Sequence, residues 1–271
     1  MVCFPNCKIN IGLYITSKRP DGYHNLETLF VPVPLTDILE VVRAPETSLT
    51  LTGIPVQGNA TDNLVMRAFQ LLQQDYPNEV GPAATYLHKV IPSGAGLGGG
   101  SSDGAFMLQT LSSLFHLELT QEQLAAYGLR LGSDCPFFIY NRPIFASGRG
   151  EVFEDVALSL SGYAIQLLCP HVHVSTSEAF KMIRPQPAAY NLREIAALPI
   201  ENWKDHIANN FEGPVFARHP QLAGFKDMLY ASGALYASMS GSGSALYGIY
   251  RKGHRPELLL PTGVDSYYMD I

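Results

Sequence analysis

Near its N-terminus the chain alternates between apolar and polar positions. From Lys8 to Ile15 every second residue is isoleucine or leucine, with Lys8, Asn10 and Gly12 among the residues between them. A period of two predicts a strand that buries one face and exposes the other. Further strands are predicted at residues 26–33, 37–42 and 48–56, so strands dominate the first part of the chain.

A helical period appears further along the chain. Apolar residues from Leu64 to Leu72 recur at helical spacing behind Asp62, which is predicted to be the N-cap of that helix. Thr120 and Gln123 have the spacing of a capping box, and the helix that they begin is predicted to end at a glycine. The sequence therefore predicts helices as well as strands before residue 150.

The second half of the chain has the same mixture. Strands are predicted at 163–170 and 245–251, and helices at 175–183 and 203–230. Because strands and helices do not alternate strictly, the pattern predicts an α+β protein rather than a doubly wound parallel sheet. A division near residue 150 is predicted, giving domains at 1–150 and 151–271.

Charge and cysteine content restrict the class of protein. The 271 residues include 18 Lys and Arg against 24 Asp and Glu, a net charge of −6, which argues against a nucleic-acid-binding protein. The four cysteines form no CxxC pair, and a reducing cytoplasm is the expected location. No signal peptide and no apolar run of about 20 residues is present, so no membrane association is expected.

A glycine-rich stretch follows the strand predicted at 84–91. Five of the seven residues from Gly94 to Gly100 are glycine, and Ser101–Asp103 are predicted to begin a helix directly afterwards. A strand, a glycine loop and a helix N-terminus together bind anions, since backbone amides converge there and no Cβ blocks a phosphate. The stretch therefore predicts a phosphate site.

The kind of phosphate site stays open on this motif alone. The stretch lacks the lysine of a Walker loop. Gly94, Gly96 and Gly99 match GxGxxG, which dinucleotide-binding folds and protein kinases share. Glu118 stands near the distance expected for a ribose-binding acid, but its surroundings do not resemble a strand, and the chain has no HRD or DFG element.

The pattern P-x-G-A-G-L-G-G-G-S-S-D, from Pro92 to Asp103, resembles the phosphate loop of the GHMP kinase superfamily. The N-terminal CKINIGLYI and the C-terminal MSGSGSALYG resemble two further motifs of that superfamily. KINIGLYITSKRPDGYHNLETLF and LGSDCPFF resemble the branch that phosphorylates 4-diphosphocytidyl-2-C-methyl-D-erythritol. The resemblance extends from about residue 7 to residue 250; Gly104 departs from it, since alanine is more usual there.

The resemblance implies a fold and a set of ligands. It implies a two-domain GHMP kinase fold, with a ribosomal protein S5 domain 2-like N-terminal domain and a ferredoxin-like C-terminal domain. It also implies ATP with Mg2+ and a small-molecule acceptor alcohol. Three alternatives remain: another kinase of the superfamily, acting on a sugar or homoserine; an NAD-binding oxidoreductase; and an RNA-binding module.

The resemblance further implies which residues form the site. Lys8 and Asp134 would be catalytic and would act as a pair, with the Lys8 ammonium keeping the Asp134 carboxylate ionised. Contacts to ATP are expected from Asn63, near the adenine, and from Pro92, Ser93, Gly94, Ala95, Gly96, Leu97, Gly98, Gly99, Gly100, Ser101 and Ser102. Contacts to the acceptor are expected from Asn10, from Tyr23, His24 and Phe180 around the cytosine, and from Ser240, Gly241, Ser242 and Gly243.

Overall fold

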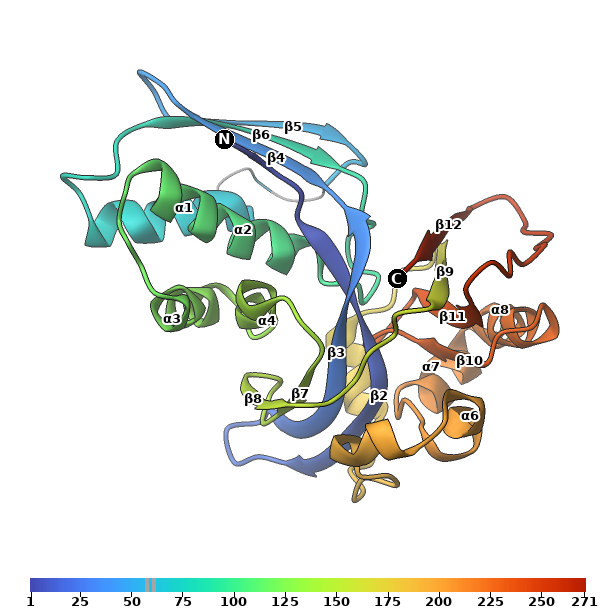
Figure 1. The fold of residues 1–271 in the computed structure, drawn as a ribbon. Coiled ribbons are helices and arrows are strands. Elements are labelled where there is room, and N and C mark those ends of the chain that lie inside the picture. The colour runs from blue at the N-terminus through green and yellow to red at the C-terminus, as the bar shows by residue number, and fades with distance from the viewer. Residues whose placement is uncertain (57–58, 60–61) are drawn as a thin grey trace. The chain divides into compact units, whose positions relative to one another are not determined.

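The computed structural model describes residues 1–56, 59 and 62–271, and its helices and strands are shown in Figure 1. They form two compact units, neither of which is continuous in sequence. Unit 1 consists of residues 1–7, 35–93 and 98–142, and unit 2 of residues 8–34, 94–97 and 143–271. Both units mix strands with helices, as the α+β prediction requires. The predicted domain boundary at residue 150 stays a prediction.

Unit 1 is a four-stranded sheet with helices on one face. The strand order is β1 (Val2–Cys3), β4 (Ile38–Arg43), β6 (Ala83–Lys89) and β5 (Ser48–Gly53). Only the β5–β6 pair is parallel. Helices α1 (Leu64–Asp75) and α2 (Gly99–Leu114) lie against the sheet, and α3 (Gln121–Leu131) and α4 (Cys135–Tyr140) pack on their other side (Figure 1).

Two helices of unit 1 begin at residues other than those predicted. Asn63, and not Asp62, is the N-cap of α1, because its Oδ1 accepts a hydrogen bond from the Val65 amide at 3.0 Å. Helix α2 begins at Gly99, before the predicted start at Ser101, because Gly98 turns the chain in a left-handed conformation with φ 72°. The predicted capping box of Thr120 and Gln123 is confirmed by both of its hydrogen bonds.

Unit 2 contains two four-stranded antiparallel sheets. The first has the order β2 (Asn6–Lys18), β3 (His24–Thr36), β7 (Ile144–Ser147) and β8 (Val152–Asp155), with the first and last few residues of the β2–β3 hairpin assigned to unit 1. The second has the order β10 (Tyr236–Met239), β11 (Leu246–Arg251), β9 (Tyr163–Pro170) and β12 (Val264–Asp270). The strands predicted at 163–170 and 245–251 are therefore β9 and β11.

The helices of unit 2 lie mostly between β9 and β10 in sequence. They are α5 (Thr176–Met182), two 3-10 helices at Leu192–Ala197 and Ile200–Asn202, α6 (Trp203–His206), α7 (Glu212–Arg218) and α8 (Pro220–Ala231). Leu13 and Ile15 of β2 join a buried cluster with residues of α7, α8 and the second sheet, such as Val215, Leu229 and Leu246. This cluster is the core of unit 2.

Strand β2 differs from its prediction in its burial. The alternation predicts one exposed face, but Lys8 and Asn10 are only 3% and 2% exposed, and the apolar residues of the other face are buried as well. Both side chains lie inside the protein because hydrogen bonds with other polar groups compensate for lost contact with water, as described below. The polar positions of this strand therefore mark an interior polar site and not a solvated face.

Candidate active site

The first half of the glycine loop, Gly94–Leu97, belongs to unit 2 and is held there by backbone contacts. The Lys8 amide donates to the Leu97 carbonyl at 2.9 Å, and the Ala245 amide donates to the Ala95 carbonyl at 3.0 Å. A Cβ on Gly96 would stand 2.0 Å from the Ser240 carbonyl oxygen, and φ there is +80°. Only glycine fits at this position, because the loop 240–244 approaches its backbone directly.

The loop that meets Gly96 is the predicted Ser240–Gly243 segment. Ser240 Oγ donates to the Gly96 carbonyl at 2.8 Å, and Ser242 Oγ shares a hydrogen bond with Thr176 at 3.1 Å. The buried amide of Asn209 donates to the carbonyls of Met239 and Gly241, both at 2.8 Å. Asn209 therefore fixes this loop, and no sequence motif had pointed to it.

Lys8 and Asn10 start a chain of buried hydrogen bonds in unit 2. Lys8 Nζ donates to Asn10 Oδ1 at 2.7 Å, and Asn10 Nδ2 donates to Thr28 Oγ1 at 3.0 Å. The Thr28 hydroxyl donates in turn to the Gly12 carbonyl at 2.6 Å. A Cβ on Gly241 would lie 3.5 Å from Asn10 Oδ1, so this chain adjoins the 240–244 loop. The Lys8 ammonium is thus held at a fixed place beside both loops.

Two of the residues predicted to bind cytosine, His24 and Phe180, contact each other in the same unit, and the third, Tyr23, is next to His24 in sequence. The rings of His24 and Phe180 stack with centroids 5.2 Å apart and planes at 21°, and Phe180 packs edge-on against Phe211. Tyr23 is 57% exposed, and the Arg149 guanidinium lies 5.1 Å from the centre of its ring. Burial lowers the pKa of His24, and the nearby Lys18 charge lowers that pKa further, so the imidazole is neutral at pH 7.

The second half of the glycine loop opens α2 in unit 1. A Cβ on Gly99 would stand 2.9 Å from Ile91 Cγ2, whereas a Cβ on Gly100 would meet nothing within 4 Å. Packing inside the protein therefore explains glycine at 99 but not at 100. The amides at the start of this 16-residue helix present the positive end of its dipole, which favours an anion.

Gly100 faces a cavity of about 190 Å³ in unit 1. The cavity is lined by Leu51, Val56, Asn59, Asp62, Asn63, Leu64, Lys89, Ser93, Gly100 and Asp103. Of the residues predicted to contact ATP, Asn63, Ser93 and Gly100 thus share one cavity, whereas Pro92 and Ser101 are not among its lining residues. Apolar side chains beside a helix N-terminus suit a nucleotide, because a base needs flat apolar contacts and its phosphates need amide donors.

A buried ion cluster that the sequence did not suggest lies at this cavity. Lys89 Nζ donates to Asp103 Oδ2 at 2.6 Å and also to Asp37 Oδ2. Asp37 accepts two further hydrogen bonds, from the amides of Val90 and Ile91 at 2.6 and 2.9 Å. Within the described residues, Asp103 Oδ1 and Ser102 Oγ are buried without a hydrogen-bond partner. The cluster ties β6 to α2 directly behind the glycine loop.

The protonation of Asp103 makes the stability of the protein depend on pH. Burial raises the pKa of Asp103 to about 7, against the lowering effect of Lys89 and with a further raising effect from Asp37. In the unfolded chain its pKa is about 3.9. Between these values the folded state binds more protons, so the stabilisation from this group is full below pH 4 and is lost as the pH rises to about 7.

We therefore expect Asp103→Asn to change the pH dependence of stability. The unfolding free energy of the wild type minus that of the variant should fall by about 2–3 kcal/mol between pH 5 and pH 8, because asparagine does not titrate. Urea denaturation at a series of pH values measures this difference. Asp75→Asn, at an exposed carboxylate whose pKa the Arg130 hydrogen bond lowers, should give a flat difference over that range. A flat difference for Asp103→Asn would contradict the prediction.

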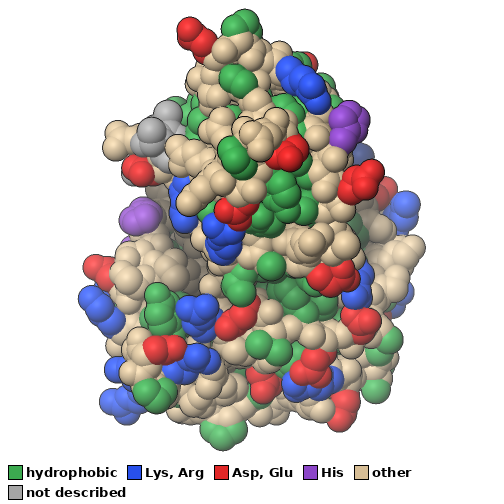
Figure 2. All heavy atoms as spheres, turned by 90° about the vertical axis from the view of Figure 1, so that its left-hand side faces the viewer, with side chains coloured by type: hydrophobic (Ala, Val, Ile, Leu, Met, Phe, Trp, Pro, Cys, Tyr) green, Lys and Arg blue, Asp and Glu red, His purple; other side chains and the backbone are tan. Residues whose placement is uncertain are grey.

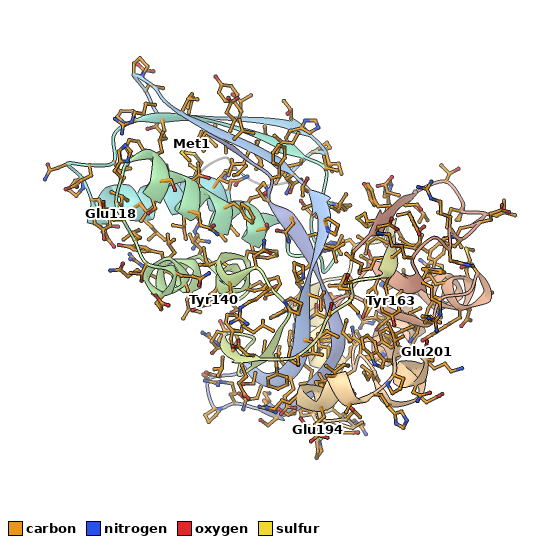
Figure 3. All side chains as sticks on the ribbon, viewed as in Figure 1. Met1, Glu118, Tyr140, Tyr163, Glu194 and Glu201 are labelled. Atoms are coloured by element: carbon orange, nitrogen blue, oxygen red, sulfur yellow. The ribbon has the colours of Figure 1, made fainter. Side chains whose placement is uncertain are left out.

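Asp134 occupies the N-cap position of α4, the short helix whose last residue, Tyr140, is labelled in Figure 3. Its side chain makes no capping hydrogen bond to that helix, and its backbone is already helical, with φ −84° and ψ −17°. Asp134 belongs to unit 1 and Lys8 to unit 2. The predicted action of these two side chains as a pair stays a proposal.

Family models identify the chain. The model described as GHMP kinases N terminal domain matches residues 63–142, and the model described as GHMP kinases C terminal matches residues 190–260. The chain belongs to the GHMP kinase family. The predicted two-domain GHMP kinase fold and the predicted kinase class are thereby confirmed. These matches favour the kinase over the alternative of an NAD-binding oxidoreductase.

Several relatives are similar over nearly their whole length. A protein of Parabacteroides distasonis is 50% identical over 93% of this chain and 92% of its own. A protein of Bacteroides thetaiotaomicron is 50% identical over 96% of this chain and 94% of its own. Both are named 4-diphosphocytidyl-2-C-methyl-D-erythritol kinase. The specific branch of the family that the sequence resembles is therefore confirmed.

Solved structures agree with this assignment. A crystal structure of 4-(cytidine 5'-diphospho)-2C-methyl-D-erythritol kinase matches with a TM-score of 0.76 and 34% identity over 92% of this chain and 89% of that one. The Methanococcus jannaschii mevalonate kinase matches with a TM-score of 0.71 and 12% identity over 100% of this chain and 98% of its own, which shows the fold alone. In the part of the chain that the structure describes, no helix combines the length and the apolar character needed to cross a membrane.

Proposed function

We propose that this protein transfers the γ-phosphoryl group of ATP to the 2-hydroxyl of 4-diphosphocytidyl-2-C-methyl-D-erythritol, a step of the non-mevalonate route to isoprenoid precursors. The observation that carries the proposal is the stacking of His24 on Phe180, which brings two distant segments of chain together in unit 2, with the exposed Tyr23 directly before His24. A sugar or homoserine acceptor has no base to stack on such rings. The names of the relatives that are 50% identical support the same acceptor.

In the proposed reaction, the chain's residues hold and orient the two substrates. Amides of Gly98–Gly100 would bind the triphosphate at the start of α2, with the base in the adjoining cavity. The Lys8 ammonium, fixed by Asn10, would stabilise charge on the transferring phosphoryl group, and Asp134 would accept the proton of the hydroxyl. A neutral His24 would hydrogen-bond to the edge of the cytosine.

Magnesium fits this site only together with the triphosphate. Among the described residues, no three histidine, cysteine or acidic side chains gather as metal ligands. Phosphate oxygens would therefore supply most of the ligands of the ion, as is common for Mg2+ at nucleotide sites. When bound, the ion neutralises charge on the β and γ phosphate oxygens.

We also propose that the protein acts in the cytoplasm and does not bind nucleic acid. None of its four cysteines forms a disulfide, as expected in a reducing compartment. On the face of the molecule shown in Figure 2, basic and acidic side chains are interspersed, and neither sign forms a continuous patch. A nucleic-acid-binding surface would require clustered positive charge.

A coupled assay for ADP release tests the proposed function. The purified chain would be given ATP with the cytidylyl substrate, mevalonate, homoserine or galactose as acceptor. Rapid turnover with the cytidylyl substrate alone supports the proposal. Faster turnover with any of the other three acceptors, or none with any, would contradict it.

His24→Ala should raise the Michaelis constant for the cytidylyl substrate by about tenfold to a hundredfold, because the hydrogen-bonding groups of the base would lose their partner. The Michaelis constant for ATP should change little. The matched control is His171→Ala, since His171 is exposed and pairs with Asp265 at 2.9 Å. Steady-state kinetics with each substrate varied in turn measure both constants. An unaltered constant for the cytidylyl substrate would remove His24 from the proposed cytosine site.

A further inference from the structure

The turn between β7 and β8 contains Arg149, which has no role in the reaction proposed above. Arg149 lies between Gly148 and Gly150, which have φ +69° and +106°. The Leu26 amide of β3 donates to the Gly148 carbonyl at 2.8 Å, and Glu151 Oε2 accepts from the Arg149 amide at 2.5 Å. The backbone of this turn is therefore held by one hydrogen bond within the turn and by another to β3.

The guanidinium of Arg149 retains hydrogen-bonding capacity. Its centre lies 5.1 Å from the centroid of the Tyr23 ring. Glu151 Oε1 stands 3.5 Å from Nε as an ion-pair partner, but Nε is buried without a hydrogen bond to any described residue. The side chain is 35% exposed. A charged group with five possible donors thus stands beside the exposed ring proposed to receive cytosine.

The same turn extends toward the proposed reacting lysine. A Cβ on Gly150 would lie 3.7 Å from Cζ of Phe30, and Lys8 Nζ lies 5.1 Å from the centroid of that ring. The Arg149 side chain therefore lies beside Tyr23, and the next residue, Gly150, lies beside the Phe30 ring that Lys8 also contacts. In the proposed acceptor, the diphosphate lies between the cytidine and the alcohol that reacts.

We infer that Arg149 binds the diphosphate of the acceptor and is a specificity-determining residue for alcohols linked to a nucleoside diphosphate. The inference rests on the proposed function, because it assumes that the acceptor binds with its cytosine at Tyr23 and His24 and its reacting hydroxyl near Lys8. A guanidinium matches phosphate oxygens with two parallel N–H donors, which gives both strength and orientation. Glu151 then orients the side chain through its ion pair.

Other charges near Tyr23 and His24 are accounted for as follows. Arg19 is one such cation, and its Nε donates to Asp21 at 3.0 Å while its Nη1 donates to Asn25 at 3.1 Å. Asp21 also interacts electrostatically with Arg149. Lys18 acts electrostatically on His24 and is a further cation near the aromatic group. An experiment must therefore separate Arg149 from Lys18.

The test compares ligands that differ only in phosphate. Dissociation constants for cytidine, CMP and CDP would be measured by calorimetry on the full chain, with saturating ADP to occupy the ATP site. We expect Arg149→Ala to raise the dissociation constant for CDP by about tenfold to a hundredfold and that for cytidine by less than about twofold. The dissociation constant for CDP in Arg149→Lys should lie between those of the wild type and the alanine variant, because lysine keeps the positive charge but lacks the two parallel N–H donors of a guanidinium.

Two control variants make the test specific. Arg193 also lies over an aromatic ring, Phe145, but its Nε and Nη2 already donate to the two carboxylate oxygens of Glu154 at 2.8 and 2.7 Å. Arg193 precedes Glu194, which is labelled in Figure 3. Arg193→Ala should leave all three constants unchanged, and Lys18→Ala should not weaken CDP selectively.

The outcomes distinguish this inference from the proposed function. If Arg149→Ala raised the dissociation constants for cytidine and CDP equally, Arg149 would only support the Tyr23 ring, and the inference would be overturned. A selective loss of CDP in Lys18→Ala and not in Arg149→Ala would also overturn it. If the wild type bound neither cytidine nor CDP, the cytidylyl acceptor itself would be wrong, and the inference would fall with it.

Discussion

Replacement of Asp134 by alanine is expected to lower the turnover number by about 10²–10⁴-fold, the usual contribution of a positioned proton acceptor. A carboxylate is a weak base toward an alcohol, but a loose transition state lets the hydroxyl proton leave late. The affinity for a non-hydrolysable ATP analogue should stay close to that of the wild type. The side chain does not cap α4, so the loss should come from chemistry rather than from the helix.

Two further variants separate the charge of Asp134 from its shape. Asp134→Asn keeps the size of the side chain but removes the base, and its turnover should be as low as that of the alanine variant. Asp75→Ala removes a carboxylate on the surface of unit 1, where it pairs with Arg130, and should leave turnover unchanged. Single-turnover kinetics together with analogue binding provide the measurement. If Asp134→Ala retained turnover within about tenfold of wild type, the assigned role would be wrong.

Lys89→Met is expected to lower the unfolding free energy by about 3–5 kcal/mol, the typical cost of removing one partner from a buried ion cluster. Asp37 and Asp103 would remain buried, at 0% and 2% exposure, without the ammonium that joins them. Their mutual repulsion would then add to their desolvation. Urea denaturation at pH 8, where Asp103 of the wild type is ionised, should show the largest effect.

A matched surface lysine provides the comparison. Lys252 pairs with Asp270 at 3.8 Å, and both side chains are more than half exposed, so Lys252→Met should cost less than about 1 kcal/mol. Adding Asp103→Asn to Lys89→Met should recover part of the lost stability, because one of the two buried charges is then gone. A Lys89→Met protein as stable as the Lys252→Met protein would show that the cluster does not stabilise the fold.

Local patterns in the sequence were sufficient for most of the fold. Period-two alternation predicted β2 and β5, because a strand with a definite face leaves that pattern, and short apolar stretches predicted β3, β4 and β9. The capping box at Thr120 was equally local. The Asp62 prediction failed because Asp62 and Asn63 are both good N-caps, and composition alone does not choose the register between them.

The candidate site was predictable only in part. The glycine loop and the RPDGYH segment have their candidate residues next to one another in sequence, so a motif was enough to suggest them. Asp37 lies 52 residues before Lys89 and Asn209 lies 32 residues before Gly241, and no local pattern links such positions. The burial of Lys8 could not be predicted for a different reason. An alternating pattern looks the same whether its lysine is exposed to solvent or buried.

The interleaved order of the two units has a consequence for synthesis of the chain on the ribosome. Every residue of unit 1 has been made once residue 142 emerges, but residues 8–34 of unit 2 have by then also been made. Leu13 and Ile15 must wait for Leu246 and Tyr250 before their shared core can close. A nascent chain therefore carries this apolar hairpin without its partners from the time residue 34 is made until residues 246–250 are made, and a chain cut after residue 142 would leave the hairpin permanently without them.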